Sequence, residues 1–584
     1  MGILEDDRTA RNRIVSETGT NFFVEAGAGS GKTTMLVNRM VALVESGEVP
    51  IDKICAITFT KAAAGEFYER FQRLLIERSD PKHKWKNKGG AGELPQPTEK
   101  TRDLCRKALQ DIDLCFMGTI DSFCNMVLSE HPSEAGILSD STIVTDAETE
   151  VLYKQIYVKI CNGECGKDLQ EMADLFRSVN YAPEGVFLAG MRALMGKRNV
   201  HFNLPNDSSI DIDAIYADTR NELIKLVSFL KDNRYDLMYT NNAPSKEAWN
   251  DINGIYLSVS RKWSDNLSNV IHNLEKLCDI RIIPEAMDIH GPNLRPYFDY
   301  GGKKNGWLEC DKGPLKVLIN EFESLKYDIS MPFLLACVNT VSRAMHDSGY
   351  LTFFDYLYYL REMLRKDAEG DGNLIRYIYN RHSYFLIDEF QDTDPLQAEI
   401  FFYLASENPT GKWYECKPRP GSLFIVGDPK QSIYRFRSAD ISSYLRVMNL
   451  FPEEEQLKLA QNFRSKDELI KYYNKVFPDL LEEDTENHDQ SGFTEIPVPS
   501  HEHDDGEIEG VFRYHLDQKS DDPEKLANMV MQLVNNEKYK IRVKDEDDTE
   551  DEGKTILRRI KFSDIMIITY TKTPLASIMQ AFDQ

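Results

Sequence analysis

The segment NFFVEAGAGSGKTTMLVNRM, from Asn21 to Met40, carries the strongest structural signal in this chain. The apolar run from Asn21 to Ala26 predicts a buried strand, and the apolar spacing from Lys32 to Glu45 predicts a helix that ends near Gly47. The glycines between them let backbone N–H groups curl around phosphates, a geometry that Cβ atoms would obstruct. Strand, glycine-rich loop and helix in this order predict a nucleotide-binding loop at the start of an α/β sheet.

Two side chains of this loop indicate how phosphates would be held. Lys32 would neutralise charge on the β- and γ-phosphates of ATP, and Thr33 would ligate Mg²⁺. The helix that follows directs its N-terminus at the anion. A glycine-rich loop alone recurs by chance, but its place between a predicted strand and a predicted helix favours nucleotide binding. The residues predicted to line the nucleotide are Ala26, which replaces the usual first glycine, and Gly27, Ala28, Gly29, Ser30, Gly31, Lys32, Thr33 and Thr34.

A second apolar strand carries the acids that an ATPase site requires. The run from Ser383 to Asp388 is apolar until its last residue, and Glu389 follows it directly. Adjacent acids on an exposed loop would be unremarkable, but acids that close a buried strand are costly unless a cation lies beside them. We therefore predict Asp388 as the metal-side carboxylate and Glu389 as the base that positions water for attack on the γ-phosphate.

The same alternation of strands and helices continues along the chain and predicts an α/β fold built on a parallel sheet. Strand signals fade from about residue 150 to 345, where segments such as 214–230 and 263–277 predict helices. The further elements predicted are strands at Lys53 to Thr58, Ser422 to Gly427 and Phe562 to Tyr570, and a helix at Ala62 to Ile76.

Composition sets the class of protein. A chain of 584 residues allows about four domains at roughly 150 residues each. The net charge of −25 means that a nucleic-acid partner would have to lie in a locally basic groove. No signal peptide or long apolar run is evident, so we predict a cytoplasmic protein without a membrane partner.

Three charged stretches stand out. The lysine-rich stretch from Arg78 to Gly92 is read as a solvated loop, with a DNA contact as the alternative. The acidic stretches Leu480 to Glu509 and Asp545 to Glu552 contain few apolar residues and are predicted to be mobile.

Seven motifs in sequence order resemble the superfamily-one UvrD/Rep-type DNA helicases, and most nearly the RecB and AddA motor subunits of helicase–nucleases. The resemblance implies a RecA-like P-loop NTPase lobe with a parallel sheet, a large helical insertion and a partial second RecA-like lobe. It places the first lobe at 1–150 and 346–445, the helical accessory insertion at 151–345, and the incomplete second lobe with its acidic segment at 446–584. The motifs are AGAGSGKT, TFTKAAAGEFYER, GTIDSFC, LTFFDYL, LIDEFQDTDPLQ, VGDPKQSIYRFRSAD and LAQNFRS.

The same resemblance implies further roles at the nucleotide. Gln431 would sense the γ-phosphate, because an amide can hydrogen-bond a phosphate oxygen and water together. Arg464 resembles an arginine finger that offsets charge on the transferring phosphoryl group. Phe463 is similar in position to the aromatic residue that stacks on adenine, although a phenylalanine there could also be core packing. The glutamine by which relatives read adenine is not identifiable between Arg8 and Ile14.

For DNA, Phe59 and Thr60 resemble a strand-contacting loop, and Tyr434, Phe436 and Arg437 combine rings and guanidinium groups that could stack bases and hold phosphates. Asp121 departs from the family pattern, because it stands where relatives usually carry histidine and a carboxylate there would repel phosphate.

The resulting hypothesis is an ATP-dependent DNA helicase or translocase of 3′→5′ polarity in repair or recombination, with ATP and Mg²⁺ as its cofactors. The partners expected are single-stranded or duplex-end DNA and a nuclease subunit. The last family motifs and a RecB-type nuclease domain do not follow, so we expect an N-terminal portion that hydrolyses ATP poorly by itself. The alternatives are an impaired DNA-binding or scaffold subunit or, third, a P-loop kinase or GTPase, which explains neither DPKQ nor NFRS.

Overall fold

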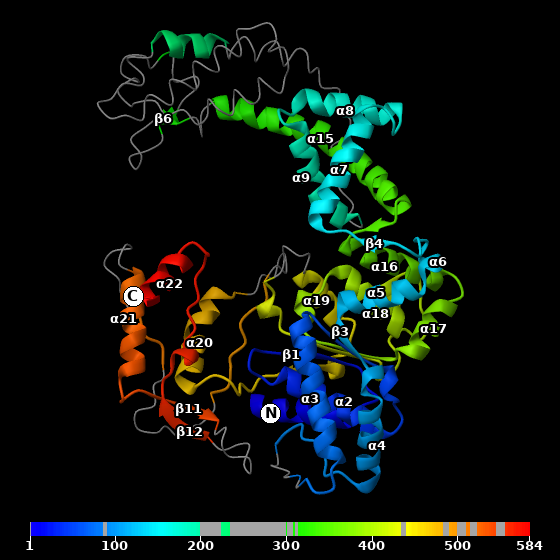
Figure 1. The fold of residues 1–584 in the computed structure, drawn as a ribbon, viewed down its shortest axis with the longest axis vertical. Helices are drawn as coiled ribbons and strands as arrows, with labels where there is room; N and C mark the ends of the chain where they lie inside the picture. The colour runs from blue at the N-terminus through cyan, green and yellow to red at the C-terminus, as the bar shows by residue number, and fades with distance from the viewer. Residues whose placement is uncertain are drawn as a thin grey trace. The chain divides into compact units, whose positions relative to one another are not determined.

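The computed structural model describes most of the chain and divides it into two compact units (Figure 1). Unit 1 comprises Met1–His131 and Leu357–Gln584, and unit 2 comprises Pro132–Tyr356. The residues described are 2–83, 85, 90–198, 224–233, 292, 299–300, 308–309, 314–433, 440–482, 490–498, 510–513, 522–544 and 555–583.

Unit 1 is built on a six-stranded sheet in the order β10-β1-β9-β8-β2-β3, and every pairing in it is parallel. The parallel α/β fold predicted from the sequence is therefore confirmed. Its strands are rich in apolar residues because helices cover both faces of the sheet. The strands are β1 (Phe22–Ala26), β2 (Ile54–Thr58), β3 (Phe116–Thr119), β8 (Tyr384–Ile387), β9 (Leu423–Gly427) and β10 (Gln456–Leu459).

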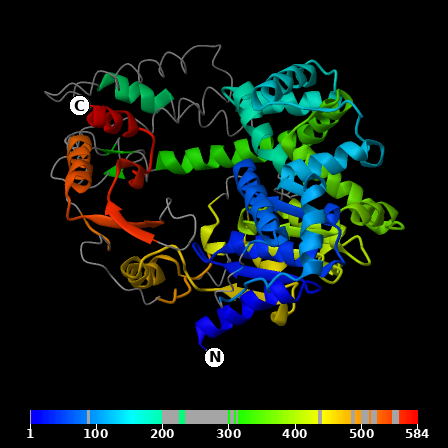
Figure 2. The same ribbon diagram turned by 60° about the horizontal axis from the view of Figure 1, so that its bottom comes forward.

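The strands of unit 1 lie among its helices (Figure 2). Successive side chains of a strand point to opposite faces of a sheet, so those of β1 face different layers of the unit. Phe22 and Val24 join a core formed with the helices on one face. Phe23 points the other way, and its ring lies 5.0 Å from that of Tyr444 and 5.6 Å from that of Phe451, centroid to centroid. The helices of unit 1 around the sheet are α1 (Ile3–Ser16), α2 (Lys32–Ser46), α3 (Lys61–Ser79), α4 (Glu99–Gln110), α5 (Ile120–Glu130), α17 (Asn373–Arg381), α18 (Pro395–Ala405) and α19 (Ile441–Met448), and α16 (Phe353–Glu369) runs into this unit from unit 2.

The sheet extends beyond residue 446, where the sequence placed the start of a second lobe. Strand β10 pairs with β1 in register, from Phe23 opposite Gln456 to Ala26 opposite Leu459. Strand β10 therefore lies beside β1, the strand that leads into the phosphate loop, and the motif that carries Arg464 follows β10 directly.

Unit 2 is mainly helical in its described part, which also holds two short strand pairs, β4 (Thr142–Ile143) with β7 (Tyr350–Leu351) and β5 (Asp299–Tyr300) with β6 (Leu308–Glu309). The rings of Phe176 and Phe333 lie 4.6 Å apart at its core, and those of Tyr157 and Phe187 are at the same distance. Of the predicted helices, 224–230 is helical, whereas 214–223 and 263–277 lie outside the described residues. The longer labelled helices of this unit are α7 (Asp146–Cys161), α8 (Lys167–Val179), α9 (Pro183–Leu194) and α15 (Pro314–Asp347), and the short α6 (Pro132–Ala135) precedes them.

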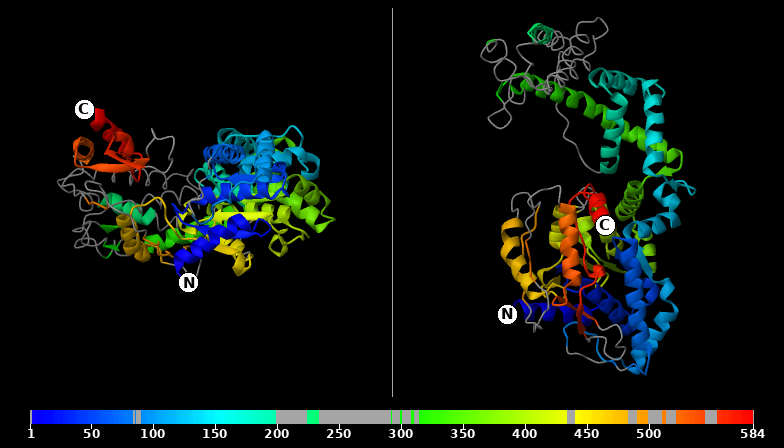
Figure 3. Two further views of the ribbon diagram at one scale, coloured as in Figure 1. Left: turned by 90° about the horizontal axis from the view of Figure 1, so that it is seen from below. Right: turned by 60° about the vertical axis from the view of Figure 1, so that its left-hand side comes forward.

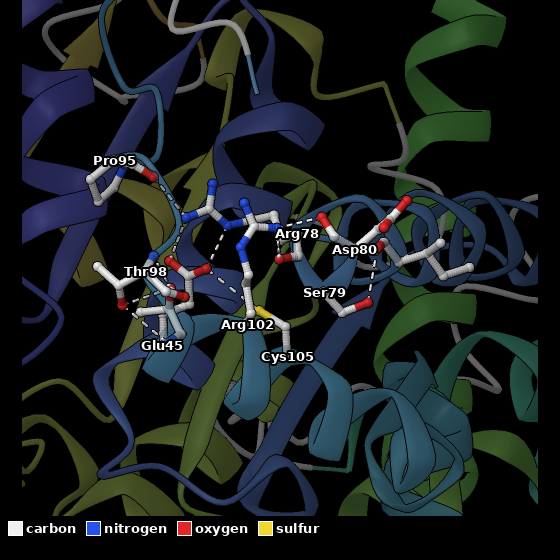
Figure 4. Close-up of polar contacts among 10 residues, drawn as sticks. Glu45, Arg78, Ser79, Asp80, Pro95, Thr98, Arg102 and Cys105 are labelled. Carbon is white, nitrogen blue, oxygen red and sulfur yellow. Dashed lines mark hydrogen bonds and ion pairs between the residues drawn. The ribbon is translucent and has the colours of Figure 1, made fainter. Parts of the chain in front are cut away.

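The lysine-rich stretch is not simply a solvated loop, because its first residue is part of the core (Figure 4). Arg78 is fully buried and donates to Glu45 at 2.8 Å and to the carbonyl of Pro95 at 2.8 Å. Its guanidinium also lies 4.6 Å from the centre of the Trp85 ring. Expectations about Lys84, Lys86 and Lys88 lie outside the described residues.

The strand predicted at Phe562–Tyr570 is wrong. A short 3-10 helix at Phe562–Asp564 opens the segment, and residues 565–570 belong to no strand and pair with no described strand. A strand requires a neighbouring backbone to complete its hydrogen bonds, and Met566 and Ile568 are instead 83% and 84% exposed.

The described elements of this part of the chain are helical apart from one antiparallel pair of strands (Figure 3). They are α20 (Asp467–Leu480), α21 (Asp522–Asn535), β11 (Lys540–Lys544), β12 (Thr555–Arg559) and α22 (Leu575–Asp583). Most of the two predicted acidic segments, at 483–489, 499–509 and 545–552, lies outside the described residues. No helix in the described ranges combines the length and apolarity needed to cross a membrane.

Candidate functional site

The phosphate loop connects β1 to α2 and adopts a backbone that only glycine accommodates easily. Gly29 and Gly31 have φ angles of 77° and 82°. A Cβ atom on Gly29 would lie 2.7 Å from Cβ of Arg464 and 2.9 Å from Oδ1 of Asn462. The loop is therefore a tight backbone cradle that packs directly against the segment after β10.

Lys32 opens α2 and meets the acidic loop that follows β8. Its Nζ lies 2.8 Å from Oε2 of Glu389, and the lysine side chain is 11% exposed. Strand β9 lies between β1 and β8 in the sheet, so the two loops meet across it at the carboxyl edge. The predicted phosphate-binding lysine and the predicted base are thus brought together by topology, because the carboxyl ends of parallel strands share one edge.

The acids after β8 lie in an environment that disfavours their charged form. The pKa of Asp388 is raised to about 6, first by burial and then by the neighbouring Glu389 carboxylate, while Lys32 acts in the opposite direction. The pKa of Asp392 is likewise raised to about 6 by burial and Glu389. Buried carboxylates with raised pKa values are typical of functional sites, including those that bind a cation.

Glu389 also has an unusual backbone. Its φ of 51° makes it the one non-glycine residue with a positive φ among the described residues. Its N–H donates to Oδ1 of Asp388 at 2.9 Å, which supports this tight turn. Backbone strain of this kind costs about 1–3 kcal/mol and gathers at functional sites.

Gln431 lies on the loop after β9, beside the acidic loop. Its Nε2 donates to Oδ2 of Asp428 at 2.7 Å. Asp428 also bonds Lys430, which in turn lies 3.0 Å from Glu25 at the end of β1. The predicted γ-phosphate sensor therefore belongs to a polar network that reaches the neighbouring strand β1.

The segment after β10 is fixed to the phosphate loop by backbone and amide contacts. Asn462 donates to the carbonyl of Ala28 at 2.9 Å, and the N–H of Phe463 donates to the carbonyl of Gly29 at 2.8 Å. Arg464 lines a cavity of about 550 Å³ together with the loop residues Gly27, Ala28 and Ser30. The predicted finger and the predicted adenine-stacking ring thus both lie next to the loop.

Sequence reasoning missed the residues of α1 beside Phe463. The Arg11 guanidinium lies 5.0 Å from the centre of the Phe463 ring, which is itself 62% exposed. Arg11 is held by Asp7 at 2.6 Å, and Asp7 also accepts the N–H of Ala460 at 2.8 Å. The interval from Arg8 to Ile14 lacks the glutamine expected there, and an arginine at this place carries no recognisable signal.

The predicted DNA-contacting residues are only partly described. Thr60 caps α3 by accepting the N–H of Ala63 at 3.1 Å, and Phe59 precedes it at the carboxyl end of β2. Tyr434, Phe436 and Arg437 lie outside the described residues. The capping contact of Thr60 does not test DNA binding. Its role as a DNA-contacting residue therefore stays a prediction.

The residues present fit ATP and Mg²⁺. The glycine cradle leaves room that a Cβ would fill, and the Ser30 hydroxyl in it is buried without a protein partner in the described part of the chain. A hydroxyl at Thr33 and a carboxylate at Asp388 are oxygen ligands of the kind Mg²⁺ takes beside phosphate oxygens. Among the described residues, no three or more His, Cys, Asp or Glu side chains gather as an all-protein metal site.

These features define a P-loop nucleotide-binding protein with a parallel sheet. The family description "UvrD/REP helicase N-terminal domain" matches residues 7–452, which is most of the chain, so the protein belongs to the UvrD/REP helicase family.

Comparison with curated proteins agrees with this family. A protein from Lactobacillus johnsonii, named as the A subunit of an ATP-dependent helicase/nuclease, is 24% identical over 98% of this chain and 48% of its own length. The protein of that name from Alkaliphilus metalliredigens is also 24% identical, with the same coverage. The one from Syntrophomonas wolfei is 25% identical over 81% of this chain and 38% of its own length. The chain thus spans about half the length, or less, of these relatives.

Proposed function

We propose that this protein is an ATP-driven DNA helicase or translocase that acts in repair or recombination with 3′→5′ polarity. The observation that carries the proposal is the Lys32–Glu389 contact of 2.8 Å, because it joins the phosphate loop to the acidic loop. Those loops are the two halves of a P-loop ATPase site. The relatives' names include the words ATP-dependent helicase, which supports the same activity. A cytoplasmic location is part of the proposal because the substrate is DNA.

The phosphate side of the site assigns roles to four residues. Lys32 would neutralise the β- and γ-phosphates, and Thr33 and Asp388 would hold Mg²⁺, which offsets phosphate charge in the transition state. Glu389 would orient the attacking water and take its proton. In this structure Nζ of Lys32 donates a hydrogen bond to the Glu389 carboxylate. Phosphate oxygens would therefore compete with that carboxylate for the lysine.

Two residues on other strands would complete the chemistry. Gln431 would report the γ-phosphate through the loop after β9, since its amide already lies in a network with Asp428. Arg464 would offset charge on the transferring phosphoryl group. Phe463, next to the loop, would stack on adenine, with the Arg11 guanidinium against its ring.

Contacts to DNA complete the proposal. Phe59 and Thr60 would contact a single strand at the carboxyl end of β2, and Tyr434, Phe436 and Arg437 would supply stacking rings and a phosphate contact. An overall charge of −25 leaves these contacts to a few basic groups, so we expect DNA affinity to fall steeply with added salt.

The test is DNA-stimulated phosphate release by the chain and two variants. We expect Lys32→Ala to weaken ATP binding and Glu389→Gln to abolish turnover while ATP still binds. Lys412→Ala serves as a control, because the ion pair of Lys412 with Glu415 is exposed at the surface and its loss should change little. DNA binding with no turnover to abolish would favour the alternative of a scaffold subunit, and a preference for guanine nucleotides would favour a GTPase.

A nuclease-bearing partner is the last part of the proposal. The relatives are named as one subunit of a helicase/nuclease, which supports assembly of this chain with a second subunit that carries a nuclease. Strand unwinding on a forked substrate labelled at either end would measure polarity, with and without that partner. Movement in the 5′→3′ direction along the bound strand would refute the 3′→5′ assignment.

A further inference from the structure

A buried glutamine connects the acidic loop to the sensor loop. Gln391 is 2% exposed, and its Nε2 donates to Oε2 of Glu389 at 2.7 Å. Its Oε1 accepts the backbone N–H of Asp428 at 2.9 Å, and its backbone carbonyl accepts the hydroxyl of Ser432 at 3.1 Å. One amide therefore bridges the loop after β8, which carries the predicted base, and the loop after β9, which carries Gln431.

This bridge requires an amide. A glutamine offers a donor and an acceptor on one rigid group, and only one orientation of the group satisfies both partners here. The space for it is closed as well. A Cβ on Gly427 would lie 2.9 Å from Oε1 of Gln391, so a larger residue at the end of β9 would push the amide away.

The two oxygens of the Glu389 carboxylate differ in their hydrogen bonds. Oε2 accepts from both Lys32 and Gln391. Oε1 accepts no hydrogen bond from the described residues, and Glu389 remains 35% exposed. If phosphates draw Lys32 away from the carboxylate, Gln391 is the donor that continues to fix its orientation, with Oε1 free to meet a water molecule.

We propose that Gln391 is a positioning residue for ATP hydrolysis, which orients the Glu389 carboxylate and keeps it in register with the loop of Gln431. This inference rests on the proposed ATPase function and deepens it. It also explains why the acidic loop needs a buried polar side chain at this place, where an apolar one would pack without satisfying Glu389 or Asp428.

The test compares Gln391→Ala and Gln391→Glu in single-turnover ATP hydrolysis with the full chain in excess. The glutamate keeps an acceptor for the Asp428 N–H but loses the donor to Glu389. Because a small misplacement of a catalytic group costs about a hundredfold, we expect both variants to be slowed by roughly 10- to 100-fold. ATP affinity, measured with a fluorescent analogue, should stay within about twofold, since orientation acts in the transition state.

A binding measurement covers the case in which the chain turns over too slowly to follow. ADP with aluminium fluoride and Mg²⁺ imitates the transferring phosphoryl group, so both variants should bind it more weakly by the same factor while binding ADP normally. Gln397→Ala is the matched control. Gln397 is also buried, but its Oε1 accepts the N–H of Asp394 at the start of α18, so its loss should lower stability without changing hydrolysis.

The outcomes separate this inference from the function beneath it. Gln391→Glu with the full rate and full affinity for the aluminium fluoride complex would overturn the positioning role. Equal losses of ATP affinity and rate would also overturn it, because they indicate a structural role alone. If Glu389→Gln hydrolyses ATP as the unaltered chain does, the proposed base is wrong, whatever the Gln391 variants show. Should Gln391→Ala fail to fold, the isosteric glutamate variant decides.

Discussion

Replacing Arg78 by methionine tests whether the lysine-rich stretch is anchored in the core. The change removes the ion pair with Glu45, the hydrogen bond to the carbonyl of Pro95 and the contact with the Trp85 ring. Arg78 is fully buried and the Glu45 side chain is 7% exposed, so the carboxylate would be left without its cation in a dry environment. Breaking a buried pair in this way costs about 3–5 kcal/mol of unfolding free energy.

A second variant shows how much of this cost comes from the unpaired charge of the Glu45 carboxylate. Adding Glu45→Gln to Arg78→Met removes the unpaired carboxylate, so we expect the double variant to recover at least about 1 kcal/mol relative to Arg78→Met. Arg106→Met is the control. Arg106 pairs with Asp103 at the surface, where its side chain is 51% exposed, and a change within about 1 kcal/mol is expected.

Hydrogen exchange of α2, α3 and α4, together with urea unfolding, would measure these changes. Exchange resolves the local effect, which matters because a chain of two units need not unfold in one step. A loss below about 1 kcal/mol for Arg78→Met, or equal losses for Arg78→Met and Arg106→Met, would refute the argument from burial.

Three further predictions concern the site and its surroundings. Arg464→Ala should leave ATP affinity unchanged and slow single-turnover hydrolysis by about a hundredfold or more, because a finger acts in the transition state; normal hydrolysis would show that Arg464 is not the finger. Arg11→Ala should weaken ATP binding about two- to tenfold in a fluorescence titration, because Phe463 loses the guanidinium packed on its ring; a hydrolysis defect without weaker binding would contradict this. Burial raises the pKa of Asp394 to about 6 in the folded chain, above its unfolded value, so the folded state binds the proton more tightly and the free energy of unfolding falls as pH rises from about 4 to 6. Asp394→Asn keeps a capping side chain without the charge and should therefore gain stability relative to the unaltered chain over that window, by at most about 3 kcal/mol, as measured by thermal unfolding at several pH values; a constant difference across the window would show that Asp394 does not titrate there.

The phosphate loop and its flanking elements could be predicted because their signals are local. The apolar run before Gly27 and the helical spacing after Lys32 depend on neighbours in the chain, and β1 and α2 form as expected, with Gly47 ending the helix. Likewise, an apolar strand that ends at Asp388 already indicates a parallel strand with a functional carboxyl end.

The strand predicted at Phe562–Tyr570 shows the limit of that reasoning. Its alternation of apolar residues is a local signal, but a strand exists only where a neighbouring backbone accepts its hydrogen bonds. The described structure provides none there, and Met566, Ile568 and Tyr570 stay exposed.

Local patterns were enough to predict a parallel α/β fold, a phosphate loop at Gly27 to Thr33 and an acidic strand end at Asp388 and Glu389, because periodicity and glycine placement act over a few residues. The folded chain was needed to show that Lys32 contacts Glu389, 357 positions away, that Asn462 bonds the phosphate loop, and that Arg78 lies in the core. Those contacts depend on strand order and on which side chains are buried together, and both are properties of the packed sheet that no local pattern encodes.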